Sequence, residues 1–177
     1  EALKYAADDP SLHEALGEAL INTGRDDEGR SELLRAAAIT GDRLRARPDD
    51  PQAIVAHADA LYAQGKLEEA AAEYEQAIRR GDAQGMQPNR LAWLQRSLGL
   101  TRWGQQRWPD MMVAYTRAIS LSPGLYTDAV AIGIATQATG KPEEAMGWYR
   151  KALALMPCDA NTRSLLAALL KKQGRQE

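Results

Sequence analysis

The chain has 177 residues, of which 45% are hydrophobic and 26% are charged, enough for one compact domain or for one stretch of a repeat array. Its formal net charge of −2 predicts no basic face, so we expect no nucleic-acid partner. No apolar run approaches the ~18 residues of a membrane span, so we expect a soluble protein with no membrane span within this chain.

Three segments follow one pattern, in which a small residue is followed by an aromatic residue four positions later and by Ala three positions after that. They read Gly65-Lys66-Leu67-Glu68-Glu69-Ala70 with Tyr74 and Ala77, Met111 (in the place of the small residue) with Tyr115 and Ala118, and Gly140-Lys141-Pro142-Glu143-Glu144-Ala145 with Tyr149 and Ala152. Tyr149 follows Tyr115 by 34 residues. A period of this size is typical of a helical repeat.

The segments upstream repeat as well. Leu98-Gly99 and Ile132-Gly133 occupy equivalent places, and a bulky residue followed by a small one permits two helices to approach closely. A glycine at the turn predicts a left-handed residue that ends the first helix of each pair. The turn glycines are Gly24, Gly65, Gly140 and Gly174, and Gln106 stands at the equivalent place in the remaining pair.

These motifs resemble the tetratricopeptide repeat, and the chain is similar to bacterial members of that family. The resemblance implies an all-α fold in which antiparallel helix pairs stack into a right-handed superhelical solenoid. It divides a single domain, residues 1–177, into repeats that open near Pro10, Pro51, Ala92 and Tyr126, with a closing helix over 160–175. Residues 1–9 align with the end of a second helix, so we expect them to be the tail of a preceding repeat in a longer array.

The spacing departs from the family period in two places. The first three repeats open 41 residues apart, seven more than the ~34 of the family. Seven residues are about two helical turns, so the first excess predicts a second helix extended through Leu33, Leu34, Ala37 and Leu44. A kink or interruption at Gly41 is the alternative. The other excess contains two glycines and a proline between Gly81 and Pro88, which predicts a loop.

Solenoids bind partners on their concave face, which the first helix of each repeat lines. By resemblance, the partner-binding groove consists of Val55, Asp59, Tyr62, Trp93, Arg96, Leu100, Trp103, Val130 and Ile134. Trp and Tyr are favoured anchors of protein interfaces, so we expect the partner to be a protein or peptide that offers an apolar or amphipathic segment. Acidic residues at Glu14, Glu18 and Asp59 favour a basic flank on that segment. The Lys, Asn and Arg clamp with which some relatives hold chaperone carboxylates is missing from these positions.

The four tryptophans divide into two groups. Trp108 and Trp148 stand where the family places packing aromatics, so we expect them in the core. Trp93 and Trp103 fit the groove and the packing interface equally well, and the sequence leaves both alternatives open.

The residues of catalytic chemistry are scarce. The chain has two histidines and one cysteine, and no H-E-x-x-H or paired C-x-x-C spacing is present. Gly81-Asp82-Ala83-Gln84-Gly85-Met86 lacks the Gly-Lys-Ser/Thr end of a phosphate-binding loop. We therefore predict no enzyme activity, no cofactor and no metal site.

The sequence leaves three functions open. The leading prediction is an interaction scaffold or assembly chaperone that binds a partner in its groove. The chain would otherwise be the regulatory or substrate-selecting arm of a larger enzyme, such as a glycosyltransferase or sulfotransferase, or a scaffold that self-associates through its open ends. The Ala- and Arg-rich, Phe-free composition is typical of a bacterial protein, of either the cytoplasm or the periplasm.

Overall fold

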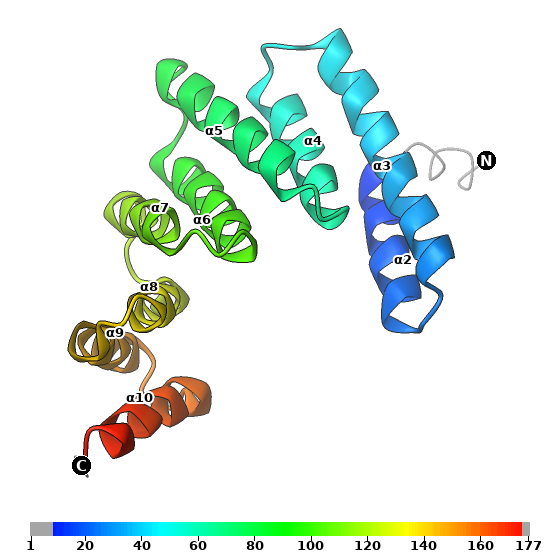
Figure 1. Cartoon of the computed structure of the whole chain (residues 1–177). Coiled ribbons are helices and arrows are strands. Elements are labelled where there is room, and N and C mark those ends of the chain that lie inside the picture. The colour runs from blue at the N-terminus through cyan, green and yellow to red at the C-terminus, as the bar shows by residue number, and fades with distance from the viewer. Residues whose placement is uncertain (1–8, 175–177) are drawn as a thin grey trace. The chain divides into compact units, whose positions relative to one another are not determined.

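The computed structural model of the chain describes residues 9–174, which form nine helices and contain no strand (Figure 1). The helices are α2 (Pro10–Asn22), α3 (Asp26–Ala46), α4 (Pro51–Ala63), α5 (Leu67–Ala83), α6 (Pro88–Gly104), α7 (Trp108–Leu121), α8 (Tyr126–Ala138), α9 (Pro142–Leu155) and α10 (Ala160–Lys172). The predicted all-α solenoid of helix pairs is thereby confirmed. The predicted repeat tail at residues 1–9 lies, except for Asp9, outside the described residues.

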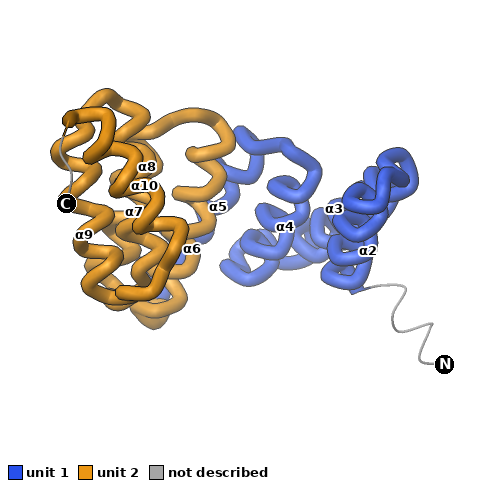
Figure 2. Tube along the Cα trace, turned by 90° about the horizontal axis from the view of Figure 1, so that it is seen from below, with its two compact units in different colours: residues 1–85 blue, residues 86–177 orange. Residues whose placement is uncertain are grey.

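The chain divides into two compact units, Glu1–Gly85 and Met86–Glu177 (Figure 2). Unit 1 contains α2 to α5 and unit 2 contains α6 to α10, and each is described by itself. Helices begin at Pro10, Pro51, Tyr126 and Ala160. The sequence placed the third repeat near Ala92, and the helix there begins at Pro88. The single domain over residues 1–177 stays a prediction.

Aspartate caps define three of the helix starts. The carboxylates of Asp9 and Asp50 accept hydrogen bonds from the backbone N–H groups two residues later, at 3.0 and 2.9 Å. In both cases a proline follows at the first helical position, where its missing N–H costs nothing. Asp159 caps α10 by accepting from the backbone N–H of Thr162, three residues later, at 2.8 Å. These caps fix where α2, α4 and α10 begin.

The two spacing excesses are resolved differently. The first lengthens α3, which runs over 21 residues and buries Leu33 and Thr40, so the predicted extension is confirmed. The second prediction, a loop from Gly81 to Pro88, is wrong in extent, because α5 continues to Ala83 with Gly81 buried and α6 already begins at Pro88. The helix continues through the buried Gly81 although glycine is a weak helix former, at a cost of about 1 kcal/mol relative to Ala.

Left-handed residues end the first helix of each pair, as predicted. The φ angles are +81° at Gly24, +74° at Gly65, +79° at Gly140 and +70° at Gly174. Gln106 adopts φ +58° at the equivalent place. The turn of the third pair therefore has the same left-handed conformation, although its residue is not a glycine.

Candidate partner-binding surfaces

Three of the predicted groove residues lie in unit 1, on α4. Val55, Asp59 and Tyr62 are spaced by four and three residues, so they share one face of the helix. All three are half-buried. Helix α2 contacts α4 and carries Glu14 and Glu18, which are also four residues apart. We call these five residues the α2–α4 surface.

The α2–α4 surface concentrates negative charge. Burial and, after it, the neighbouring carboxylates of Asp59, Glu18 and Asp9 together raise the pKa of Glu14 to about 7. Burial also raises the pKa of Asp59, although the hydroxyl of Tyr74, which donates to its carboxylate, opposes the shift. A nearby cation would relieve this repulsion. The surface is therefore complementary to a basic group.

The other six predicted residues lie in unit 2, and we call them the α6–α8 surface. Four of them are on α6 (Trp93, Arg96, Leu100 and Trp103) and two on α8 (Val130 and Ile134). The side chains of Trp93 and Leu100 are 46% and 43% exposed, large values for apolar residues of this size. A cluster of exposed apolar side chains is a usual mark of an interaction site.

The guanidinium of Arg96 is occupied within unit 2. Its Nε lies 2.9 and 2.8 Å from the two carboxylate oxygens of Asp128, and its terminal nitrogen donates to the carbonyl oxygen of Ser122 at 3.0 Å. The side chain of Asp128 is only 2% exposed and that of Arg96 17%. Arg96 therefore ties α6 to α8, and the atoms that the surface leaves open are mainly apolar.

Unit 2 contains a pocket of about 290 Å³ that residues of both helices line. Trp103, Val130 and Ile134 line it, so the structure brings together three of the predicted residues from two helices. The other lining residues are Tyr115, Tyr126, Thr127, Ala131, Asp159 and Asn161. The pocket combines apolar walls with a few polar groups, which is usual for sites that bind a ligand side chain.

The structure distinguishes the four tryptophans. Trp108 and Trp148 pack against the buried cluster around Met111 and Tyr115, as predicted. Trp103 packs against the same cluster, its ring 6.5 Å from that of Trp108 at a tilt of 58°, and it also lines the pocket. Trp93 is exposed. Trp103 thus takes part in both packing and the open surface, whereas Trp93 belongs to the surface alone.

Comparison with known proteins agrees with the fold of the chain. The model of the tetratricopeptide-repeat family matches residues 55–125. The structure of MamA is 14% identical over 85% of this chain and 84% of its own, with a TM-score of 0.71. That of YrrB, described as a TPR protein with an unusual peptide-binding site, is 17% identical over 99% of this chain and 84% of its own, with a TM-score of 0.68. The matched segment has the sequence of tetratricopeptide repeats, and the chain shares the fold of the TPR protein YrrB. No curated protein sequence matches the chain.

Some residues that line the unit 2 pocket were not among the predicted site residues. Tyr126 and Asp159 line the unit 2 pocket from the first residue of α8 and the cap of α10. The groove residues were predicted from positions along helix faces, so residues at helix ends were not considered. The predicted first residue of each first helix, and its cap, would have indicated Tyr126 and Asp159.

Each of the two histidines lies close to a glutamate of the neighbouring helix. His13 Nδ1 lies 2.5 Å from the carboxylate of Glu32, and His57 Nδ1 lies 3.4 Å from that of Glu73. Across residues 9–174, no group of three or more His, Cys, Asp or Glu side chains could hold a metal ion. The same residues include no helix with the length and apolar character needed to cross a bilayer.

Proposed function

We propose that the chain is a protein-interaction scaffold whose α6–α8 surface binds an apolar or amphipathic segment of a partner protein. The observation that carries this proposal is the pocket lined by Trp103, Val130 and Ile134, together with the exposed Trp93 and Leu100 on the same unit. An apolar side chain of the partner would fill the pocket, and the partner's apolar face would cover Trp93 and Leu100. Aromatic anchors at such sites contribute most of the binding free energy in protein interfaces.

Two further observations support a peptide or helical segment as the partner. Tetratricopeptide repeats are an interaction fold, and YrrB, a protein of similar fold, is described as having a peptide-binding site. The side chains of the α6–α8 surface also lie on two helices. An amphipathic helix of a partner binds such a surface through apolar residues that recur at helical spacing along one of its faces. Where the partner reaches the α2–α4 surface, Glu14, Glu18 and Asp59 favour basic residues.

The test compares two double variants of matched exposure. Trp93→Ala/Leu100→Ala removes the exposed apolar side chains of the α6–α8 surface. The control, Val113→Ala/Leu155→Ala, removes apolar side chains of unit 2 that are 64% and 53% exposed on α7 and α9. Because all four side chains are exposed, we expect both variants to keep their helical circular dichroism.

A partner would be isolated with the wild-type chain from cells of the source organism, and its affinity for the three proteins measured by calorimetry. We expect the control to bind as the wild type does. The α6–α8 variant should bind at least tenfold more weakly, since truncation of an interface aromatic typically costs about 2 kcal/mol or more. Equal affinity of the two double variants would overturn the proposal.

A further inference from the structure

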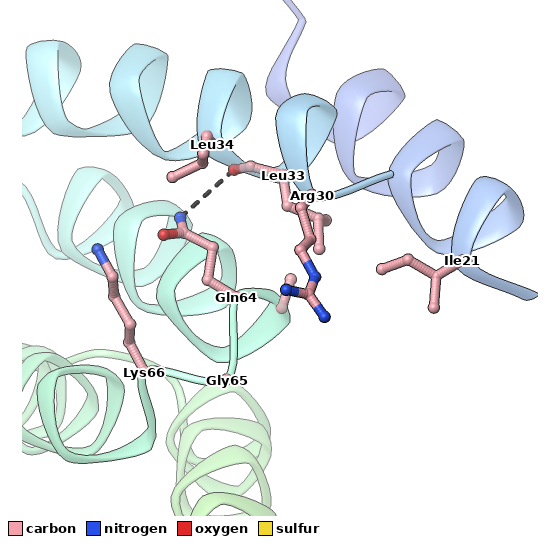
Figure 3. Close-up of a pocket in the computed structure, with 8 residues that line it drawn as sticks. Ile21, Arg30, Leu33, Leu34, Gln64, Gly65 and Lys66 are labelled. Carbon is pink, nitrogen blue, oxygen red and sulfur yellow. Dashed lines mark hydrogen bonds between the residues drawn. The ribbon is translucent and has the colours of Figure 1, made fainter. Parts of the chain in front are cut away.

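Unit 1 also contains a pocket, and none of the five residues of the α2–α4 surface is among its lining residues. It has a volume of about 460 Å³ and lies among the last turn of α2, the first half of α3 and the turn after α4. Ligand pockets in proteins typically measure about 300 to 1,000 Å³. The lining residues, most of them labelled in Figure 3, are Ile21, Arg30, Leu33, Leu34, Ala63, Gln64, Gly65 and Lys66.

One part of this pocket is apolar and open. Leu33 is buried at its base, whereas Ile21 and Leu34 are 38% and 57% exposed. No atom lies within 4 Å of the position that a Cβ at Gly65 would take, so this wall borders free space. Side chains of this kind are stabilised when an aliphatic group covers them.

The other part carries two cationic side chains that form no ion pair with a described residue. Arg30 and Lys66 are exposed and, among the described residues, neither makes an ion pair. The neighbouring arginines differ, because Arg25 pairs with Glu28 at 2.6 Å and Arg35 with Glu32 at 2.9 Å. In Figure 3, Arg30 comes from α3 and Lys66 from the turn after α4, on either side of Gln64. The amide of Gln64 is held by the carbonyl oxygen of Leu33 at 3.4 Å.

We infer that this pocket binds a peptide segment in which an acidic residue stands next to an aliphatic one. The aliphatic side chain covers Ile21, Leu33 and Leu34, and the carboxylate pairs with Arg30, while Lys66 on the other side of Gln64 adds a second positive charge. A guanidinium presents paired N–H donors that match a carboxylate, and an ammonium adds a flexible second charge. This site lies on different residues from the α6–α8 surface. The pocket favours an acidic residue, whereas the α2–α4 surface favours a basic one. The inferred peptide binding is therefore independent of the proposed function.

The experiment selects peptides from a random display library on the full 177-residue chain, with counter-selection on Arg30→Ala/Lys66→Ala. Both substituted side chains are exposed, so the variant should fold as the wild type does. We expect the enriched peptides to share Asp or Glu within two positions of Leu, Ile or Val. Peptides that use the α6–α8 surface bind both proteins and are removed by the counter-selection, which separates this result from the proposed function.

The best peptide is then measured by fluorescence anisotropy. We expect about tenfold weaker binding to Arg30→Ala/Lys66→Ala, and a similar loss when its acidic residue is changed to Gln or Asn. The control variant Arg90→Ala/Arg117→Ala, which removes two exposed arginines of unit 2, should bind as the wild type does.

Three results would overturn the inference: no enriched peptide, enriched peptides without acidic residues, or equal binding to the two double variants. Vesicles of anionic lipid are tested in parallel. If they bind through Arg30 and Lys66 while no peptide does, the two cations serve a membrane surface and the inference is wrong.

Discussion

The ring of Tyr149 lies directly against the backbone of Gly133. A Cβ at Gly133 would stand 2.5 Å from Cε1 of that ring, and a Cβ at Gly99 would stand 2.7 Å from Cε2 of Tyr115. Tyr149 is fully buried, so its ring has no free direction in which to move. The glycine of the first helix and the tyrosine of the second therefore form one packing unit, which occurs twice in unit 2.

Gly133→Ala should destabilise the protein. The added methyl group collides with the ring of Tyr149, and overpacking of this kind costs about 1 to 3 kcal/mol. Gly147→Ala is the control, because Gly147 is also helical and nothing lies within 4 Å of its Cβ position. That change should be neutral or stabilise by up to about 1 kcal/mol. Urea unfolding followed by circular dichroism measures both, and equal stability of the two variants would refute the packing argument.

Gln106→Gly should stabilise the protein. Gln106 holds φ +58°, a conformation that costs a residue with a side chain about 1 kcal/mol or more and costs glycine little. Part of the gain is lost because glycine makes the unfolded chain more flexible, so we expect a net gain of about 0.5 kcal/mol. Gln106→Ala keeps a side chain at the left-handed φ and should therefore show no gain in stability. Thermal unfolding measures the stability of both variants. A lower melting temperature for the glycine variant would contradict the prediction.

Asp128→Ala should be strongly destabilising, because it leaves the guanidinium of Arg96 largely buried without its carboxylate. Removal of one partner from a buried ion pair typically costs about 3 to 5 kcal/mol, and we expect the lower end because Arg96 is 17% exposed. The comparison is Asp110→Ala, whose ion pair with Arg107 is 46% and 48% exposed and should contribute less than about 1 kcal/mol. Denaturant titrations of both variants provide the test. Similar decreases in the free energy of unfolding for both variants would show that the Arg96–Asp128 ion pair does not stabilise the fold more than an exposed pair does.

The raised pKa of Glu14 predicts a pH dependence of stability. The folded state favours the protonated carboxyl, so this contribution is full below about pH 4.5 and is lost as the pH rises through about 7. A glutamine at position 14 does not ionise, so Glu14→Gln removes this loss of stability at high pH. At pH 8 it should raise the free energy of unfolding by about 1 kcal/mol, a value reduced for the solvent screening of a half-exposed group. At pH 4 the variant and the wild type should differ little.

The matched control for Glu14 is Glu69→Gln, which changes an exposed glutamate on α5. It should not alter the pH profile. A Glu14→Gln variant whose advantage is the same at pH 4 and pH 8 would show that the carboxylates of the α2–α4 surface do not interact as described.

Much of the fold could be predicted from local spacing. The interval from Tyr115 to Tyr149 reflects a packing unit that repeats, and the turn glycines reflect a backbone angle that few other residues adopt. The end of α5 could not be predicted, because Gly81 resembles a loop residue until its burial is known. Nothing local indicates the pair of Arg96 and Asp128, which stand 32 residues apart.

The candidate site was predictable only in part. Counting positions along the helices indicated Trp103, Val130 and Ile134, and the structure places these three around one pocket. The count could not show that Arg96 is already paired or that Trp103 also packs against Trp108. The unit 1 pocket was missed because it forms where a helix end, a helix face and a turn meet. That these surfaces bind a partner stays a prediction.

The central claim, that the α6–α8 surface contacts a partner protein, is tested most directly by photocrosslinking in the source organism. A p-benzoylphenylalanine replaces Trp93 in one variant and Val113, on α7, in the other; both side chains are exposed. We predict that irradiation joins a partner to the chain from position 93 and not from position 113. Crosslinks from position 113 alone, or equal crosslinks from both positions, would contradict the claim.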